Sequence, residues 1–357
     1  MGGAERVAAS LANHWVGKGY TVAVATLTSE ASDFYTLDPR VDRFALNVAR
    51  PSRNVLAAVC NNLRTLWAVR RLLRQWQPQA TIALMSTANV YLALAATGLP
   101  GRKIGSEHIH PPMLPLGRAW EMLRRYAYGR LDHLVALTEA SAAWLRSHTQ
   151  ARHLTVIGNP IPWPLPEQAP IRDPVALLPP ARHRLLAVGR LVEQKGFDLL
   201  IDAFARLVPA FPAWDLVIVG EGGARASLQA QAARLGLQGR VFLVGTVGNV
   251  GDWYSACDLY VMSSRFEGFG NTLAEAMAYG LPVISFDCET GPSDIIRQDV
   301  DGWLVPAGDL DALVAALAAM MSDEGQRQRF AKRAIEARDR FSLRRVAGQW
   351  EALFEGK

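Results

Sequence analysis

Cysteine is scarce in this chain of 357 residues. The three cysteines, Cys60, Cys257 and Cys288, are an odd number and show none of the paired spacings of a zinc site. The sequence therefore predicts neither a disulfide framework nor structural zinc, and it indicates a reducing compartment.

Several other patterns are missing. No short apolar leader with a positive start opens the sequence, so we expect a protein that is not secreted. The most apolar long stretch, residues 80–100, is interrupted by Ser86, Thr87, Asn89 and Thr97, which favours a strand and a helix over a membrane span. No Gly-x-Gly-x-x-Gly follows a predicted strand and no Walker A run occurs, so NAD and P-loop sites lack support.

The bulk composition is that of a globular protein, with 50% apolar and 20% charged residues. The length suggests two domains. The net charge of +5 is small, and we expect no nucleic-acid partner. Arginines nevertheless crowd residues 64–74 and 118–130.

Short apolar runs alternate with amphipathic segments, which predicts parallel sheets covered by helices. The predicted strands cover residues 21–27, 80–84, 103–106, 134–137, 154–157, 184–188, 216–219, 241–243, 259–262, 283–286 and 303–305, and helical patterns cover 5–18, 54–75, 140–148 and 343–354. Eight prolines between Pro160 and Pro180 break this alternation. We therefore expect a first domain at 1–160, a semi-rigid linker at 161–182 and a second domain at 183–342.

The most informative segment is 263–309, in which Glu267 and Glu275 stand eight residues apart. Between them lies a loop whose amides, those of Phe269, Gly270, Asn271 and Thr272, lead into a predicted helix. Unpaired amides at a helix N-terminus bind anions, and carboxylates accept hydrogen bonds from hydroxyls. The pattern is typical of a nucleotide-sugar site, with a helix expected to start near Thr272 and Glu275 in its first turn. The alternative is a helix-terminus carboxylate at Glu275 and a solvated loop carboxylate at Glu267.

Two further loops follow predicted strands. Arg190 and Lys195 come after the strand at 184–188 and are candidates for holding phosphates, unless they are exposed surface cations. Glu221 follows Val219-Gly220, where it either contacts a nucleotide base or is a turn residue. Asp299-Val300-Asp301 precedes a strand, so we interpret it as a turn and predict no metal ligands.

Residues 263–309 resemble the E-x7-E motif of retaining glycosyltransferases of family 4, which have the GT-B fold. Residues 186–196 are similar to that family's strand and diphosphate loop, and Gly2-Gly3-Ala4-Glu5-Arg6-Val7 to its glycine loop. Ser106-Glu107-His108 and Gly158-Asn159-Pro160-Ile161 also fit.

The resemblance implies two Rossmann-like domains facing across a cleft, with the last helix, within 343–357, packing back on the acceptor-binding first domain. It implies that Gly3, Arg190, Lys195, Glu221, the amides of residues 269–272 and Glu275 bind the donor. It also implies that Glu267 and His108 contact the transferred sugar, although His110 leaves the histidine ambiguous.

In the family a central strand precedes the glycine loop, whereas here Met1 directly precedes Gly2. We therefore expect a missing first strand, with two neighbouring strands left unpaired. Either the start codon is placed too late or the chain is a fragment, and a longer form should be the more stable one.

Residues 286–293 are similar to a subset that builds bacterial surface glycans on polyprenyl diphosphate and includes N-acetylgalactosaminyltransferases. An Arg- and Trp-containing amphipathic pattern at 59–76 predicts a helix that lies on an anionic membrane surface, or else a sheet-covering helix with a solvated basic face.

The sequence thus predicts a retaining glycosyltransferase on the cytoplasmic face of the membrane, independent of metal and cofactor. Its substrates are a nucleotide-sugar, with UDP-GalNAc one candidate, and a lipid-linked glycan acceptor. A GT-B epimerase and a non-catalytic membrane-associated protein of the same fold are the alternatives.

Overall fold

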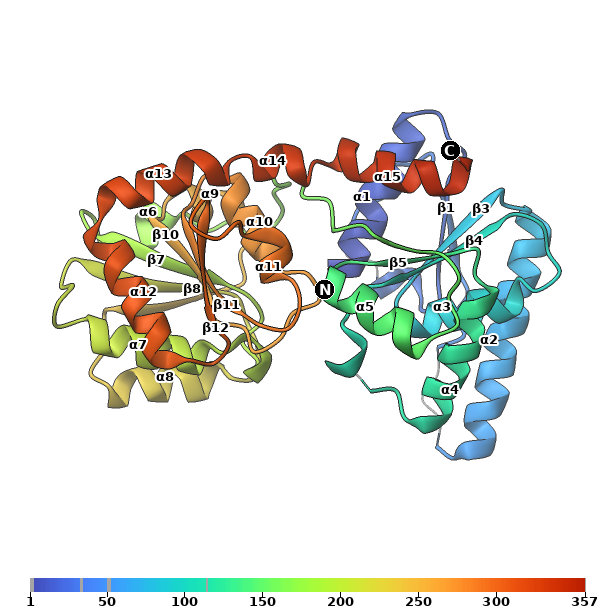
Figure 1. Cartoon of the computed structure of the whole chain (residues 1–357), viewed down its shortest axis with the longest axis horizontal. Helices are drawn as coiled ribbons and strands as arrows, with labels where there is room; N and C mark the ends of the chain where they lie inside the picture. The colour runs from blue at the N-terminus through green and yellow to red at the C-terminus, as the bar shows by residue number, and fades with distance from the viewer. Residues whose placement is uncertain (1–2, 33–34, 50–52, 114, 357) are drawn as a thin grey trace. The chain divides into compact units, whose positions relative to one another are not determined.

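The computed structural model describes residues 3–32, 35–49, 53–113 and 115–356. The chain divides into two compact units (Figure 1). One is formed by Met1–Pro160 with Leu343–Lys357, and the other by Ile161–Ser342. Gly2, part of the expected glycine loop, lies outside the described residues.

The first unit alternates strands and helices. Its elements are α1 (Gly3–Gly17), β1 (Ala23–Thr26), β2 (Asp42–Ala45), α2 (Val55–Trp76), β3 (Ala80–Leu84), α3 (Ser86–Ala95), β4 (Arg102–Glu107), α4 (Arg118–Ala127), η3 (Tyr128–Arg130), β5 (His133–Ala136), α5 (Glu139–His148), β6 (Leu154–Val156) and α15 (Leu343–Glu355). All strand pairs are parallel and form two sheets, β1-β2 and β3-β4-β5-β6. Among the described residues β1 pairs with β2 alone and β3 with β4 alone, so each has an edge without a strand partner.

Local chemistry sets the helix ends in this unit. Asn54 precedes α2, and its side-chain oxygen accepts from the amide of Ala57 at 2.8 Å, which satisfies one of the orphan donors of the first turn. Thr138 caps α5 in the same way through Ser141. The apolar stripe of α15 packs with α1 and the sheet in one core cluster, where Trp350 is buried.

The second unit is an open α/β sheet. Its elements are α6 (Pro174–Leu177), β7 (His183–Val188), η4 (Glu193–Lys195), α7 (Phe197–Leu207), β8 (Trp214–Val219), α8 (Arg225–Arg234), β9 (Val241–Gly245), α9 (Val250–Ser255), β10 (Leu259–Met262), α10 (Asn271–Ala278), β11 (Val283–Asp287), α11 (Pro292–Ile295), β12 (Gly302–Pro306), α12 (Leu310–Ser322), α13 (Glu324–Ala334) and α14 (Ala337–Arg340). Six parallel strands follow the order β12-β11-β10-β7-β8-β9. Every residue of β8 is buried, as expected for a central strand covered on both faces.

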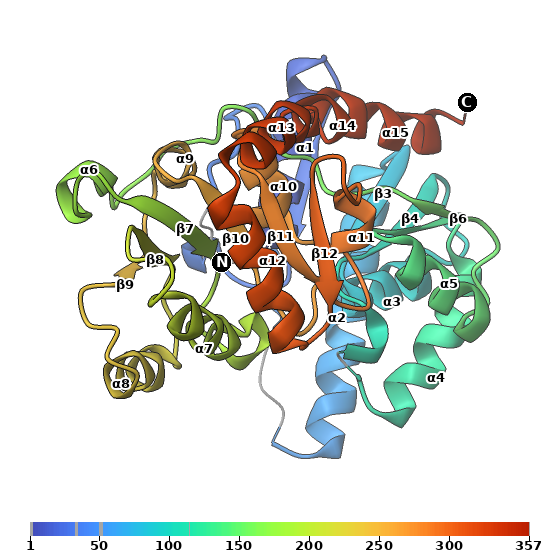
Figure 2. The same cartoon turned by 60° about the vertical axis from the view of Figure 1, so that its left-hand side comes forward.

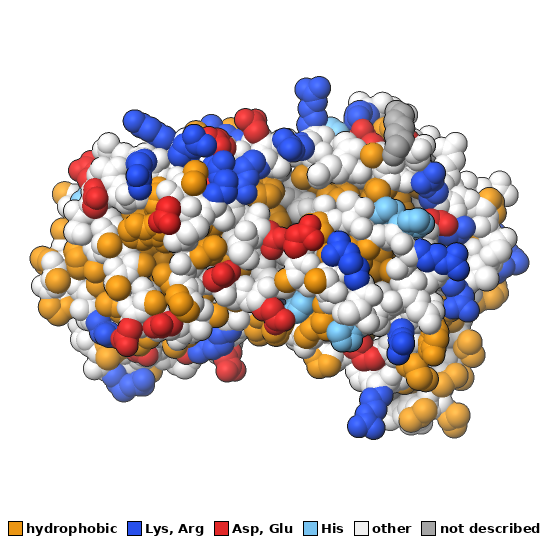
Figure 3. All heavy atoms as spheres, in the orientation of Figure 1, with side chains coloured by type: hydrophobic (Ala, Val, Ile, Leu, Met, Phe, Trp, Pro, Cys, Tyr) orange, Lys and Arg blue, Asp and Glu red, His pale blue; other side chains and the backbone are white. Residues whose placement is uncertain are grey.

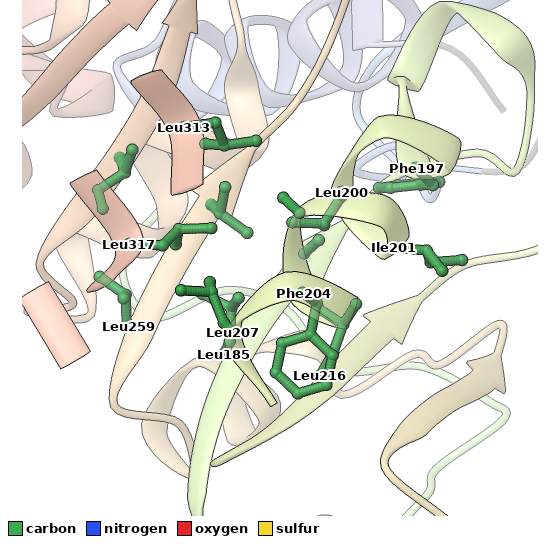
Figure 4. Close-up of a cluster of buried hydrophobic side chains, with 14 of the residues drawn as sticks. Leu185, Phe197, Leu200, Ile201, Phe204, Leu207, Leu216, Leu259, Leu313 and Leu317 are labelled. Atoms are coloured by element: carbon green, nitrogen blue, oxygen red, sulfur yellow. The ribbon is translucent and has the colours of Figure 1, made fainter. Parts of the chain in front are cut away.

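Helices α7, α8 and α12 lie along one face of this sheet (Figures 1 and 2), and their apolar side chains form one core cluster with those of the strands. Figure 4 shows this cluster, in which Phe204 and Leu207 of α7 lie close to Leu185 and Leu216 of the strands. The predicted α/β fold with parallel sheets is confirmed.

The proline-rich segment belongs to the second unit. The amide of Leu165 donates to the Tyr279 hydroxyl at 3.1 Å, and the amide of Gln168 donates to the carbonyl of Gly248 at 3.1 Å. The segment thus packs along the second unit, because backbone amides of its non-proline residues donate hydrogen bonds to that unit. The interpretation of 161–182 as a linker standing between two domains differs from this arrangement.

Candidate functional site

The strand order of the second unit places a switch point between β7 and β10. From β7 the chain adds β8 and β9 on one side, then returns to add β10, β11 and β12 on the other. In such open sheets, ligands bind beyond the carboxyl ends of the strands where the order reverses. The loops after β7 and β10 are therefore the candidate site.

Lys195 and Glu267 meet at this point. Lys195 ends the short η4 turn after β7, and Glu267 follows β10 by five residues. The Lys195 ammonium lies 2.5 Å from Glu267 Oε1, and the two side chains are 15% and 8% exposed. Ser264 donates to the same carboxylate oxygen at 2.6 Å. The Glu267 carboxylate is therefore fixed and largely buried, and the interpretation as a solvated loop residue is wrong.

Glycines let these loops approach each other closely. Gly196 has φ 61°, and a Cβ on it would lie 2.0 Å from the carbonyl oxygen of Ser263. Gly220, at the end of β8, has φ 141°, and its Cβ would lie 1.9 Å from the carbonyl oxygen of Gly189. No other residue fits either position without moving the backbone. The loops after β7, β8 and β10 thus form one packed surface.

The predicted amide loop leads into α10. Gly270, with φ 100°, precedes Asn271, the first residue of the helix, and Thr272 follows in its first turn. The side chain of Phe269 is buried against Phe341, with ring centroids 5.6 Å apart. Residues 269–272 can therefore offer a ligand their backbone amides and the positive end of the helix dipole.

Glu275 does not lie in the first turn of α10. The helix starts at Asn271, one residue earlier than expected, so Glu275 is the fifth helical residue and falls in the second turn. It is buried, and one carboxylate oxygen accepts from the Tyr254 hydroxyl at 3.0 Å. Tyr254 also donates to the carbonyl of Thr272 at 3.3 Å, which ties Glu275 to the helix start.

Arg190 and Glu221 lie on the rim of this loop surface. Arg190 is exposed, and no hydrogen bond or ion pair of its side chain is found within the described part of the chain. The Glu221 carboxylate accepts from Arg225 Nε at 2.9 Å and from the amide of Gly222 at 3.2 Å. The hydrogen bond from Arg225 is the main reason that the pKa of Glu221 is lowered.

His108 belongs to the first unit, where it follows the carboxyl end of β4. It is buried, and its Nε2 lies 3.2 Å from the Ser106 hydroxyl. Its buried Nδ1 has no hydrogen-bond partner among the described residues. Burial lowers the pKa of His108 to about 4, so the ring is neutral near pH 7. His110 lies nearby and places its Nδ1 3.0 Å from the Ser141 hydroxyl.

A buried polar network adjoins His108, and the partners that Glu107 has in it were not among the predicted site residues. Glu107 accepts from Ser86 at 2.7 Å and from the Tyr128 hydroxyl, and Asn89 donates to Tyr128 at 3.2 Å. Burial raises the pKa of Glu107. Gly3, the remaining predicted donor contact, is the first residue of α1 in the same unit and is exposed.

Residues that hold the two glutamates were also missed. Ser264 bonds Glu267, Tyr254 bonds Glu275, and Thr290 donates to the carbonyl of Glu267 at 2.5 Å. Only Ser264 stands near its partner in the sequence. Tyr254 comes 21 residues before Glu275, and Thr290 comes 23 residues after Glu267. No spacing pattern in the sequence points to either residue.

The Asp299–Asp301 pair is engaged by protein groups. Asp301 is fully buried and pairs with Arg297 and Arg340, and Asp299 accepts from the Trp303 indole at 2.8 Å. Residues 299–301 form a turn before β12, as predicted. Among the described residues no group of three metal-binding side chains occurs.

Comparison with known proteins agrees with this geometry. The model of "Glycosyltransferase Family 4" matches residues 1–162, and that of "Glycosyl transferases group 1" matches residues 173–337. The chain belongs to the GT-B glycosyltransferases of family 4. The first match ends two residues after Pro160, where the N-terminal part of the first unit ends, and the second match lies within the second unit.

Two relatives match this GT-B chain along nearly all of its length. The amylovoran biosynthesis glycosyltransferase AmsD of Erwinia amylovora is 26% identical over 99% of this chain and 95% of its own. An exopolysaccharide phosphotransferase of Streptomyces coelicolor is 28% identical over 99% of this chain, which spans only 39% of that relative's length.

A solved structure shows the same fold. HepE of Anabaena, in complex with UDP and glucose, superposes with a TM-score of 0.79 at 21% identity, covering 100% of this chain and 96% of HepE. In the described ranges of the GT-B chain, every helix is too short or too polar to span a bilayer.

Proposed function

We propose that this glycosyltransferase transfers a sugar, with retention of anomeric configuration, from a UDP-sugar to a glycan acceptor in bacterial polysaccharide assembly. The observation that carries the proposal is the buried Lys195–Glu267 pair at the switch point, beside the N-terminus of α10. The pair holds a cation and a carboxylate 2.5 Å apart. This arrangement suits a nucleotide-sugar, because such a ligand carries phosphates next to hydroxyls.

The reaction breaks the bond between the anomeric carbon and the diphosphate oxygen. Negative charge develops on the leaving diphosphate, and groups already in place stabilise it without reorganisation. Lys195, Arg190 and the amides of residues 269–272 take this role, and Lys195 has protons left after its bond to Glu267. Because these groups supply the positive charge, we propose that the transfer needs no metal or cofactor.

The carboxylates and the histidine act on the sugars. Glu275 accepts from the ribose of the nucleotide, and Glu221 lies at the end of β8, where the base would bind. Glu267 accepts from a hydroxyl of the transferred sugar and His108 contacts the same sugar near the reacting carbon. Donor phosphate helps to deprotonate the acceptor on the front face, so no covalent intermediate on a glutamate is formed.

The relatives guide the choice of substrates. HepE is solved with UDP and glucose, and AmsD is named for amylovoran biosynthesis. We propose UDP as the nucleotide, with UDP-GalNAc a first sugar to test, and a polyprenyl-diphosphate-linked glycan as acceptor.

The first unit has a surface suited to a lipid-linked acceptor, the α2–α4 face, formed by Val55, Leu56, Val59, Leu63 and Trp67 of α2 with Met122 and Tyr126 of α4. Leu63 and Trp67 are about 60% exposed, at 59% and 61%, and Thr65 is the only buried residue of α2. Tyr91 of α3 bonds Asn62 of α2 at 2.7 Å and packs on Trp120 of α4, so both helices lie on α3.

Cations border the α2–α4 face, where hydrophobic and basic side chains gather over the ends of the two helices (Figure 3). Arg64, Arg71 and Arg74 are exposed on α2, and Arg71 lies over the Trp67 ring at 5.4 Å. The exposure of these apolar side chains supports a surface-lying role for α2 over a purely sheet-covering one. We propose that this face lies on the anionic cytoplasmic surface of the membrane.

A two-step experiment tests the proposed reaction. A thermal-shift panel of UDP-, GDP- and ADP-sugars identifies the donor, since a ligand at 100 times its Kd adds about 2.7 kcal/mol of stability. Transfer to a polyprenyl-diphosphate-linked glycan is then followed by NMR of the new anomeric proton. Transfer with retention is expected. Donor isomerisation without acceptor would identify an epimerase, and stabilisation by no nucleotide-sugar would leave a non-catalytic GT-B protein.

A further inference from the structure

A cavity lined by charged side chains lies in the first unit, away from the loops of the candidate donor site. It has a volume of about 830 Å³ and is lined by the residues that open β4 and β5, those before β6, and the end of α3. We call it the strand-start pocket. It sits at the amino ends of these parallel strands, whereas His108 follows the carboxyl end of β4. The two sites therefore occupy opposite edges of the sheet.

Most of the ionisable side chains that line the strand-start pocket are basic. Four arginine or lysine residues and two histidines line it, against one carboxylate: Arg102, Lys103, Arg130, Arg152, His133, His153 and Asp132. The carboxylate of Asp132 is already bound by Lys103. Its oxygen accepts from the Lys103 amide at 2.7 Å and lies 3.8 Å from the Lys103 ammonium. The pocket thus keeps an excess of positive charge.

The carbonyl groups of the wall are also satisfied. The end of α3 would present negative partial charge, which disfavours an anion. Arg70 donates to the carbonyls of Ala95 and Thr97 at 2.6 and 2.9 Å, and the Thr97 hydroxyl donates to Ala93 at 3.1 Å. These bonds cover the acceptors of the helix end and add a further cation behind the wall.

Donors remain available inside the pocket. Arg152 is exposed and has no side-chain partner among the described residues, and Arg130 holds only a 3.4 Å bond to the Tyr126 carbonyl. Arg102 is anchored from outside by a 2.9 Å bond to the Leu353 carbonyl. Guanidinium groups so placed match the oxygens of a phosphate group.

The two histidines lie in a region of positive electrostatic potential. His133 and His153 stack with ring centroids 6.0 Å apart. The pKa of His133 is lowered by burial first, and then by the positive charges of His153 and Arg102. Part of the pocket wall, within residues 93–103, belongs to a segment without acidic residues, since no Asp or Glu occurs between residues 43 and 106. Nothing in the proposed transfer uses this charge.

We propose that the strand-start pocket binds a phosphate-type anion, a phosphate or diphosphate group, at a site separate from the donor site. Arg130 and Arg152 supply the hydrogen bonds, and Lys103 and His153 supply further positive charge. The group is either a soluble phosphate compound or the headgroup of an acidic lipid, which present the same oxygens.

The test uses the full chain and inorganic pyrophosphate, with sodium chloride at equal ionic strength as the control for screening. NMR spectra of the histidine rings at fixed pH should show the His153 resonances shifting as pyrophosphate is added, because an anion bound nearby changes the electrostatic field at the ring. Arg102, His133, Arg152 and Asp132 are the charged groups around it. His148 on α5, outside the pocket, should not respond.

Variants locate the response. Arg152→Ala and Arg130→Ala should each weaken pyrophosphate binding about tenfold or more, whereas Arg146→Ala, another exposed arginine of this unit, should not. A Lys195→Met variant should keep the His153 response, which separates this site from the proposed donor site.

Sedimentation with vesicles of phosphatidic acid and phosphatidylcholine distinguishes the two sources. A lipid headgroup is indicated if pyrophosphate has no effect but Arg152→Ala and Arg130→Ala, and not Arg146→Ala, reduce binding to the acidic vesicles. Absence of both responses, or equal responses in all three variants, would overturn the proposal.

Discussion

Lys195 and Glu267 are 72 residues apart in the chain, yet the ammonium and the carboxylate lie 2.5 Å apart. Neither group is exposed by more than 15%. Burying one charge of such a pair without the other is strongly unfavourable. The pair therefore joins the loops after β7 and β10 and, at the same time, holds a cation ready for the donor diphosphate.

A double-mutant cycle separates these two roles. Lys195→Met leaves the Glu267 carboxylate buried without its cation, and we expect the free energy of unfolding to fall by about 3 kcal/mol. Lys195→Met/Glu267→Gln should recover most of that loss, because no charge is then buried. Turnover should be lost in both variants. Urea unfolding and initial rates are the measurements, and recovery of turnover in the double variant would make the pair purely structural.

Arg190 should behave differently, because it is exposed and its side chain makes no hydrogen bond or ion pair within the described residues. Arg190→Ala should change the free energy of unfolding by less than about 0.5 kcal/mol. Turnover should fall by roughly 10²–10³, the effect of removing one electrostatic contact to the transition state. EDTA should leave the rate of the unaltered protein unchanged.

The matched control for Arg190 is Arg206→Ala. Arg206 is half-exposed on α7 of the same unit and pairs with Asp311, away from the switch point. Equal rates for the two variants would refute the diphosphate contact of Arg190, and loss of activity in EDTA would require a metal.

Most strands of this fold were predictable, because the strands of parallel sheets appear as short continuous apolar runs. The strand β2 was missed, because its sequence, Asp-Arg-Phe-Ala, contains two charged residues. The predicted ranges 80–84 and 259–262 coincide with β3 and β10. Segments held by distant contacts were not predictable. The proline-rich stretch 161–182 looks like a spacer in the sequence, but its amides bond Tyr279 and Gly248 of the second unit.

In the candidate site, too, the local motif was predictable and the distant contacts were not. A carboxylate, a glycine loop and a helix start within ten residues identify Glu267 and Glu275. The sequence does not reveal that Lys195 neutralises one and Tyr254 bonds the other, since those partners come from other strands and helices. The helix start was predicted one residue late because Gly270 with φ 100° lets α10 begin at Asn271.

Variants at Glu275 and Tyr254 distinguish an effect on donor binding from an effect on stability. Glu275→Gln keeps an acceptor for the Tyr254 hydroxyl and removes the negative charge. Tyr254→Phe removes the hydroxyl and keeps the carboxylate. If Glu275 accepts from the ribose, Glu275→Gln should raise the donor Kd about tenfold, and Tyr254→Phe should mainly lower stability by about 1 kcal/mol. Calorimetric binding and thermal unfolding distinguish them; identical effects on both quantities would favour a structural role for the carboxylate.

His108 should make the stability depend on pH. Its pKa is about 4 in the folded chain, below the model-peptide value of 6.5. The unfolded chain therefore binds the proton more tightly. The stabilisation is present above pH 6.5 and is lost as the pH falls from 6.5 towards 4. At pH 5 the loss amounts to about 2 kcal/mol.

His108→Gln should remove this part of the pH dependence. The difference in unfolding free energy between pH 7.5 and pH 5 should shrink by about 2 kcal/mol relative to the unaltered chain. His148→Gln, at an exposed position, is the control. Unfolding in urea at both pH values is the measurement, and an unchanged difference in His108→Gln would show that this ring is not buried in the neutral form.

The α2–α4 face should bind vesicles through two separable contributions. Leu63→Ser/Trp67→Ser removes outward apolar area and should weaken binding at every salt concentration. Arg71→Ala/Arg74→Ala removes two cations, each contributing about 1 kcal/mol near an anionic surface, so binding at low salt should fall about tenfold or more. At high salt the arginine variant should differ little from the unaltered chain, because screening already weakens those contacts.

Leu235→Ser, at an exposed apolar position in the second unit, is the matched control. Flotation with anionic vesicles at low and high salt is the measurement. If the unaltered chain does not float at low salt, the membrane assignment fails and a soluble acceptor replaces the lipid-linked one.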